Sequence, residues 1–170
     1  MAQVDRQQVA SAFGGARDYA GNAAIQQVIA AELATRIAAA GIAGDRPRIL
    51  EIGCGTGFLT RELLARGFGG EWLITDKSPA MVSRCAAGLG AAPGRSFAVL
   101  DGEYGMADHH GAYDLICASM AMQWFDNLAA AVATLVRKLR PGGQLLFNTL
   151  AEGTFREWRD AHRACGQGNG

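Results

Sequence analysis

The sequence has no surplus of charge of either sign. Sixteen lysines and arginines balance sixteen aspartates and glutamates in 170 residues, so the formal net charge at pH 7 is zero. Proteins that bind nucleic acid or anionic membrane surfaces usually carry a basic excess, so we expect neither as a partner. The sequence also lacks a run of the ~20 apolar residues that a membrane span needs, and its N-terminus lacks the apolar core of a signal peptide. These absences favour a soluble, cytoplasmic protein.

Cysteine is scarce, and its spacing is not that of a metal site. The four cysteines, at positions 54, 85, 117 and 165, lie far apart and form no C-x-x-C pair. This pattern matches neither a zinc site nor the disulfide framework of a small secreted domain. His109 and His110 are adjacent, but no third ligand is spaced to complete a metal site with them. We therefore expect reduced thiols and no bound metal.

The first part of the chain has a helical pattern. Residues 3–40 are rich in alanine and glutamine, and apolar residues such as Val28, Leu33 and Ile37 recur at helical spacing. A glycine pair within residues 13–15 divides this stretch into a short helix and a longer one. We expect an N-terminal helical segment over residues 1–46.

Short apolar strands alternate with helices beyond that segment. The expected strands are residues 48–52, 71–76, 96–101, 113–119 and 144–150. Strands that alternate with helices form a parallel sheet through right-handed crossovers, and near-continuous apolar strands are typical of burial on both faces. The sequence therefore predicts a doubly wound α/β domain over residues 47–170, in which ligands bind at the carboxyl ends of the strands.

Helix boundaries in this region carry capping signals. Ser78 followed by Pro79 marks the start of one helix, and Asp126 can cap another. The sequence PGG at residues 141–143 predicts where that second helix stops. Residues 154–164 are expected to form a final helix.

The glycine-rich stretch ILEIGCGTGFLT, residues 49–60, follows the first predicted strand. A phosphate-binding loop needs a Lys-Ser or Lys-Thr pair after its last glycine, but Gly57 is followed by Phe58. The same phenylalanine occupies the position of the third glycine in a dinucleotide turn. Glu51, two residues before Gly53, would repel a pyrophosphate and suits an ammonium or sulfonium group. The turn therefore predicts a cationic ligand without phosphate.

Acidic residues end the next two predicted strands. Asp76 ends the second strand, where a carboxylate can accept hydrogen bonds from both ribose hydroxyls. Asp101 ends the third strand and can accept a hydrogen bond from the exocyclic amine of an adenine, while Met81 can cover one face of the adenine ring. Together with the glycine turn, these residues describe a nucleoside that carries a positively charged amino-acid group.

These motifs resemble those of the class I S-adenosylmethionine-dependent methyltransferases. The resemblance covers residues 48–150 and rests on E-x-G-C-G-T-G at 51–57, Asp76, D-G-E at 101–103, YDLICASMAMQWF at 113–125 and LRPGG at 139–143. It implies a Rossmann-like fold and S-adenosyl-L-methionine as the cofactor, with S-adenosyl-L-homocysteine as the product. FGGARDYAGNAAIQ, SMAMQWFDNL and NTLAEGTFREWRDAH are similar to the malonyl-acyl-carrier-protein O-methyltransferases of biotin synthesis.

The resemblance also implies roles for individual residues. The expected cofactor-binding residues are Tyr19, Glu51, Gly53, Cys54, Gly55, Asp76, Lys77, Met81, Asp101, Gly102 and Ser119. Tyr19 lies on the N-terminal segment, which folds over the cofactor as a lid in this family, and Cys54 is expected to offer its backbone rather than a reactive thiol. Gln123 and Trp124 are expected to face the acceptor pocket. A carboxylate acceptor is already ionised at neutral pH and needs no general base, so no catalytic residue is assigned.

One departure from the family leaves other functions open. The family's sheet has seven strands, whereas this sequence supplies five, so the last two strands are expected to be missing and the fifth to be an exposed edge. The first alternative is another small-molecule O- or C-methyltransferase of the same fold. The second is a non-catalytic S-adenosylmethionine-binding module, and a dinucleotide oxidoreductase is a more distant third.

Overall fold

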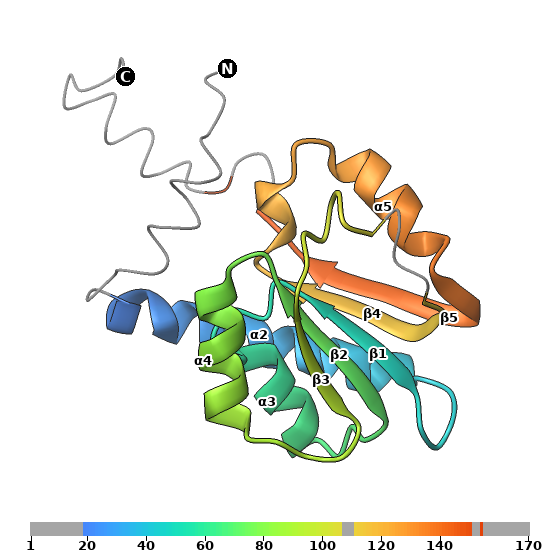
Figure 1. Ribbon diagram of the computed structural model, residues 1–170, viewed down its shortest axis with the longest axis horizontal. Helices are drawn as coiled ribbons and strands as arrows, with labels where there is room; N and C mark the ends of the chain where they lie inside the picture. The colour runs from blue at the N-terminus through green and yellow to red at the C-terminus, as the bar shows by residue number, and fades with distance from the viewer. Residues whose placement is uncertain (1–18, 107–110, 151–153, 155–170) are drawn as a thin grey trace.

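A five-stranded parallel sheet forms the centre of the protein (Figure 1). The computed structural model describes residues 19–106, 111–150 and 154, with side chains from residue 24 onward. The strands are β1 (Arg48–Ile52), β2 (Glu71–Asp76), β3 (Arg95–Val99), β4 (Tyr113–Ser119) and β5 (Leu139–Asn148). They lie in the order β3-β2-β1-β4-β5, and every neighbouring pair is parallel. The order reverses between β1 and β4, so this is the switch point at which ligands bind in such sheets.

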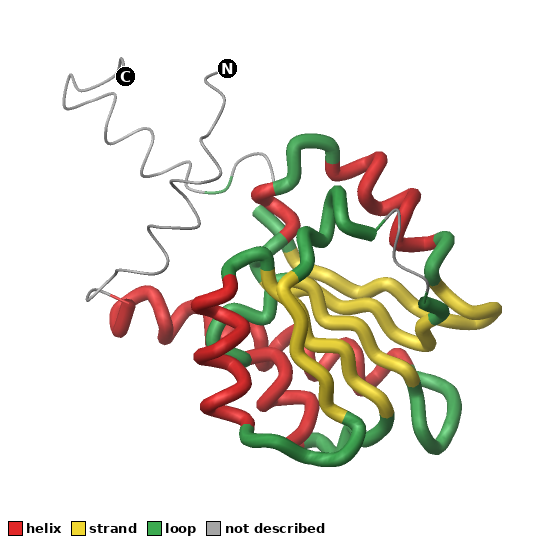
Figure 2. The backbone as a smooth tube through the Cα atoms, in the orientation of Figure 1, coloured by secondary structure: helices red, strands yellow, loops and turns green. Residues whose placement is uncertain are grey.

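Helices cover both faces of the sheet (Figure 2). They are α2 (Tyr19–Ala40), α3 (Phe58–Ala65), α4 (Pro79–Leu89) and α5 (Leu128–Val136), with a short 3₁₀ helix, η1 (Met122–Trp124), after β4. Alternate residues of β1 divide between the two faces. Ile49 packs with α2, α3 and α4 in one hydrophobic cluster, whereas Leu50 packs with α5 in the other. This division confirms the doubly wound architecture.

Most of the predicted elements are confirmed, because β1, β2 and β4 have the predicted bounds. Helix α2 ends at Ala40, as expected, and α4 begins at Pro79 with Ser78 at the N-cap position. The predicted break at residues 13–15 and the final helix beyond residue 154 lie outside the described residues. No helix in the described ranges is long and apolar enough to cross a membrane.

Three boundary predictions are wrong. Strand β3 ends at Val99, so Asp101 lies two residues beyond the strand rather than at its end. Helix α5 is capped by Asn127 rather than Asp126, because the Asn127 side chain accepts a hydrogen bond from the Ala130 amide at 3.0 Å. The PGG sequence lies inside β5 instead of ending the helix before it. Tyr113 pairs with Leu139 but Leu115 pairs with Gln144, so the residues between them bulge from the strand. Gly142, with φ of 81°, makes this bulge possible.

The carboxylate of Asp114 joins three strands at the amino-terminal edge of the sheet. It lies on β4, and its Oδ2 accepts the backbone N–H of Arg48 on β1 at 2.7 Å. The same oxygen accepts a hydrogen bond from the Arg140 guanidinium on β5 at 2.8 Å. One side chain therefore links β1, β4 and β5 at the end of the sheet away from the candidate ligand-binding edge.

We predict that Asp114→Ala lowers the free energy of unfolding by about 1–3 kcal/mol, because it leaves the Arg48 amide without its acceptor. Urea denaturation measures the loss. Glu71→Ala is the control, since the Glu71 carboxylate is 60% exposed and lies 3.8 Å from Arg48 Nε. The control is expected to cost less than about 0.5 kcal/mol. Equal losses in the two variants would contradict the assigned role.

Candidate functional site

The glycine turn joins β1 to α3 at the carboxyl edge of the sheet. Gly53, Gly55 and Gly57 all have positive φ, at 68°, 53° and 85°. Residues with a Cβ rarely adopt this conformation, which explains the three glycines. The turn is fixed by backbone hydrogen bonds from Cys54 N to Thr75 O and from Gly57 N to Cys54 O, each at 2.8 Å.

The first two glycines of the turn have different surroundings. A Cβ at Gly53 would lie 2.3 Å from Cβ of Ala121, so the turn packs directly against the segment after β4. A Cβ at Gly55 would meet no atom within 4 Å. A second close approach occurs at Gly102, outside the turn, where a Cβ would lie 2.2 Å from Cγ2 of Ile52. The glycines therefore bring three strand ends together and leave open space in front of Gly55.

Asp76, the last residue of β2, holds the turn from the side. Its Oδ2 accepts the Gly55 N–H at 2.9 Å, and its Oδ1 accepts the Ser78 N–H at 2.8 Å. A carboxylate oxygen has two lone pairs, so each oxygen can accept a further hydrogen bond from a ligand. The structure thus places Asp76 beside the glycine turn, as the sequence predicted.

Asp101 and Lys77 form an ion pair between the segments that follow β2 and β3. The Lys77 Nζ lies 2.9 Å from Asp101 Oδ2, while Asp101 Oδ1 accepts the N–H groups of Glu103 and Tyr104. Burial opposes ionisation of Asp101, but the hydrogen bonds from Lys77 and the two amides outweigh it and lower the pKa of the carboxyl. Asp101 is therefore an ionised acceptor at neutral pH.

Glu103 is a structural residue of the site whose role is not predicted from the sequence. It is 9% exposed, and its carboxylate accepts the N–H groups of Asp126 at 3.0 Å and Asn127 at 2.7 Å. It fixes the segment after β3 to the segment before α5. The D-G-E motif was the available signal, but the partners lie more than twenty residues away in the sequence.

Glu51 lies beneath the glycine turn rather than at the mouth of the site, where the sequence analysis expected it. Its side chain is 1% exposed, and Thr60 Oγ1 donates a hydrogen bond to Glu51 Oε2 at 2.5 Å. Burial raises the pKa of Glu51 from its ordinary value of 4.5 to about 7, against the opposing effects of Thr60 and the Arg61 charge. The negative charge of Asp76 raises this pKa further. Its contact with a cofactor stays a prediction.

The segment after β4 begins with a backbone conformation that is unusual for its residue. Met120 has φ of 52°, the one positive value outside glycine in the part of the chain that the structure describes. Its N–H donates to Asn148 Oδ1 at 2.7 Å, and its C=O accepts from Gln123 Nε2 at 2.8 Å. Gln123 Oε1 is buried and has no hydrogen-bond partner among the described residues.

The remaining predicted site residues are placed as follows. Ser119, partly buried, ends β4, and Trp124, in η1, is 41% exposed. Met81 is 3% exposed in the first turns of α4. The Cys54 thiol is buried, and its hydrogen bond with Cys85, together with burial, raises its pKa. The side chain of Tyr19 lies outside the described residues.

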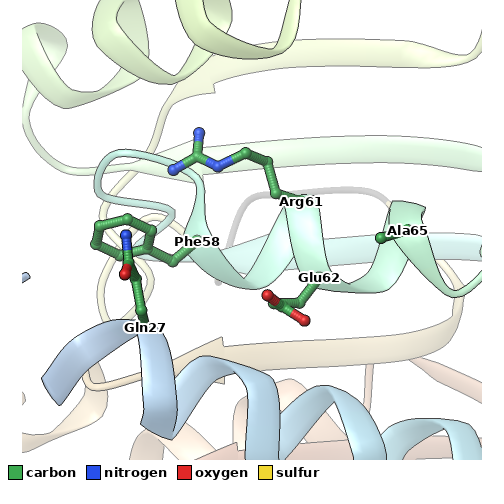
Figure 3. Close-up of a pocket in the computed structure, with 5 residues that line it drawn as sticks. All are labelled: Gln27, Phe58, Arg61, Glu62 and Ala65. Carbon is green, nitrogen blue, oxygen red and sulfur yellow. The ribbon is translucent and has the colours of Figure 1, made fainter. Parts of the chain in front are cut away.

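A hollow of about 380 Å³ lies between α2 and α3 (Figure 3). Its lining residues are Gln27, Phe58, Arg61, Glu62 and Ala65. None of them is a predicted site residue. The Arg61 guanidinium stacks 5.2 Å from the centre of the Phe58 ring and donates to the Thr56 carbonyl at 2.8 Å. Arg61 therefore supports the glycine turn from α3.

Sequence comparison identifies the family to which this arrangement belongs. Residues 23–166 match a protein family described as a methyltransferase domain. The chain belongs to this family. The match includes all five strands, and so all the strand ends described above.

Curated relatives of this methyltransferase domain are longer proteins. A malonyl-[acyl-carrier protein] O-methyltransferase of Magnetococcus marinus is 47% identical over 148 residues, which are 86% of this chain and 54% of that protein. A biotin biosynthesis bifunctional protein BioCD of Bordetella avium is 46% identical over 155 residues, 91% of this chain and 32% of that protein. The chain therefore spans about half the length of the first relative and about a third of the second.

Solved structures confirm the fold of the methyltransferase domain. The N-methyltransferase NodS from Bradyrhizobium japonicum, in complex with S-adenosyl-L-homocysteine, matches with a TM-score of 0.62 and 23% sequence identity. The match covers 75% of this chain and 65% of that one. The predicted Rossmann-like class I methyltransferase fold is thus confirmed.

We predict that alanine is tolerated very differently at two glycines of the turn. Both substitutions place a Cβ on left-handed backbone, at a cost of about 1–2 kcal/mol. Gly53→Ala also clashes with Ala121, which adds about 1–3 kcal/mol. Gly53→Ala is therefore expected to lower the melting temperature of the methyltransferase domain more than Gly55→Ala does. Equal melting temperatures would show that the segment after β4 does not pack on Gly53.

We predict that ionisation of Glu51 destabilises the folded domain. Because its pKa is raised to about 7 in the folded state, the unfolded chain loses this proton first as the pH rises above about 4.5. The resulting loss of stability is complete above about pH 7 and reaches about 3 kcal/mol. Denaturation of Glu51→Gln between pH 5 and pH 8 tests this, because the variant lacks this loss and gains stability relative to the wild type. Parallel profiles would contradict the prediction.

Proposed function

We propose that this methyltransferase domain binds S-adenosyl-L-methionine at the carboxyl ends of β1, β2, β3 and β4 and belongs to an enzyme that transfers its methyl group. The observation that carries the proposal is the contact between Asp76 and Gly55. An ionisable acceptor with free lone pairs lies beside a glycine turn that has open space in front of it. The residues present fit the cofactor, since this arrangement offers hydrogen-bond acceptors and room, and Lys77, the basic residue that follows β2, is paired with Asp101.

The chain's residues have distinct roles in this proposal. Asp76 accepts hydrogen bonds from the ribose hydroxyls. Asp101, which lies beside Lys77, accepts a hydrogen bond from the exocyclic amine of the adenine. Gly102 allows the segment after β3 to approach β1, and Met81 covers the ring. The backbone of the glycine turn and of Ser119 surrounds the methionine part.

The charge state of the site supports a cationic cofactor. Glu51 lies beneath the turn with a pKa raised to about 7, so a positive charge bound nearby favours its ionised form. Asp101 is already ionised, with Lys77 as its partner. A sulfonium methyl group is the electrophile that the cofactor supplies when bound.

The proposed acceptor is the free carboxyl group of a malonyl thioester on acyl carrier protein, in biotin synthesis in the cytoplasm. The names of the two curated relatives support this choice. A carboxylate is ionised at neutral pH, so the domain needs to orient the reactants and exclude water rather than remove a proton. Trp124, which is 41% exposed beside the end of β4, is proposed to contact the acceptor. Gln123 is proposed to line the same pocket.

We predict that Asp76→Ala weakens the binding of S-adenosyl-L-homocysteine, measured by calorimetric titration, by at least about tenfold. The variant loses the acceptor for the ribose and the bond that holds Gly55, and hydrogen bonds to charged groups contribute about 1.5–3 kcal/mol. Asp45→Ala is the matched control, since Asp45 lies on the exposed loop between α2 and β1. The wild type is expected not to bind NAD.

Assays with acceptors distinguish the proposed substrate from the alternatives. Formation of a methyl ester on malonyl-acyl carrier protein, detected by mass spectrometry, supports the proposal. Turnover of free small acids but not of the carrier-bound malonyl group favours another small-molecule methyltransferase. Cofactor binding without turnover of any acceptor favours a non-catalytic binding module. If the wild type binds no S-adenosyl-L-homocysteine, the cofactor proposal is wrong for this chain.

A further inference from the structure

Asn148 lies where three elements meet. It is the last residue of β5 and is partly buried. Its Oδ1 accepts the N–H of Met120 after β4 at 2.7 Å, and its Nδ2 donates to the C=O of Ile29 in α2 at 3.3 Å. These partners are 28 and 119 residues away in the sequence. One amide side chain therefore joins the ends of β4 and β5 to the N-terminal helix.

The bond to Met120 supports a conformation that methionine does not favour. With φ of 52°, Met120 needs stabilisation from its surroundings. Side chains from two other positions bond both of its polar backbone groups, Asn148 at the N–H and Gln123 at the C=O. The conformation of Met120 is therefore set by tertiary contacts rather than by local sequence.

This conformation determines how the next residue meets the glycine turn. Ala121 follows Met120, and its Cβ lies 2.3 Å from the position that a Cβ at Gly53 would occupy. A change in the backbone at Met120 therefore moves Ala121 relative to the turn. Asn148 acts on the turn through this path, without contacting it.

We propose that Asn148 is a positioning residue that sets the cofactor-binding edge of the sheet and makes its geometry depend on the docking of α2. An asparagine amide provides an acceptor and a donor at once, as both bonds require, whereas aspartate lacks the donor and alanine lacks both. The inference rests on the proposed function only in that S-adenosyl-L-homocysteine is the ligand used to test it. It adds a contribution from β5 and α2 to a site otherwise built on the other strand ends.

The first test compares Asn148→Ala with Gln144→Ala. Gln144 is on the same strand, four residues before Asn148, and bonds to the last residue of α2 and the residue after it, through the carbonyls of Ala40 and Gly41 at 3.2 and 3.3 Å. Both variants are expected to lower the melting temperature. Asn148→Ala is expected to weaken S-adenosyl-L-homocysteine binding about tenfold, corresponding to 1.4 kcal/mol, whereas Gln144→Ala leaves it within about twofold. Equal effects on affinity would overturn the proposal.

The second test asks whether relieving the conformation at Met120 restores binding. Glycine adopts positive φ without support, so Met120→Gly in the Asn148→Ala background is expected to recover most of the lost affinity. Asn148→Asp keeps the acceptor for Met120 and loses the donor to Ile29, so its affinity is expected to fall between those of the wild type and Asn148→Ala. No recovery in the double variant would mean that Asn148 does not act through Met120.

Amide hydrogen exchange keeps this proposal separate from the identity of the ligand. Without any ligand, Asn148→Ala is expected to speed exchange in residues 119–122 and in α2, whereas Gln144→Ala speeds it in α2 alone. If the wild type does not bind S-adenosyl-L-homocysteine but this exchange pattern is found, the proposed cofactor is wrong and the positioning role stands. Unchanged exchange in residues 119–122 of Asn148→Ala overturns the positioning role.

Discussion

The two hydrogen bonds accepted by the Asp76 carboxylate hold the candidate site together. One oxygen fixes the glycine turn before α3, and the other fixes the start of α4. Both helices pack on the same face of the sheet, so their first turns are held relative to each other by a single residue at the end of β2. Because β1 and β2 are parallel and paired in register, the turn and this carboxylate meet at the same edge.

Carboxylates at this edge differ in charge because their surroundings differ. Asp101 has a cation and two amides around it and is ionised, while Glu51 has one hydroxyl and nearly complete burial and titrates near neutral pH. Asp76 lies between them with backbone amides as its partners. The site therefore combines an ionised acceptor, Asp101, with one acid, Glu51, whose charge can follow that of a bound ligand, which suits the proposed sulfonium cofactor.

The amino-acid sequence predicts the parts of this structure that depend on local pattern. The apolar runs of β1, β2 and β4, the three glycines and the strand-end acids were all recognisable. The early start of β5 was not, because its bulge depends on pairing with β4. The left-handed backbone of Met120 and the two bonds of Asn148 have no local signal either, since they involve residues far away in the sequence. The burial of Glu51 follows from the packing of α3, which its neighbours in the sequence do not specify.

The strand order has a consequence for the order of folding. Residues paired between β1 and β2, such as Arg48 and Glu71, are 23 positions apart, whereas Ile49 and its partner Leu115 on β4 are 66 apart. Closing the longer loop costs about 0.9 kcal/mol more in chain entropy. We therefore expect β1, β2 and β3 to assemble as an early unit, with β4 and β5 added later. On this route the switch point, where the glycine turn meets Ala121, is among the last parts of the protein to form.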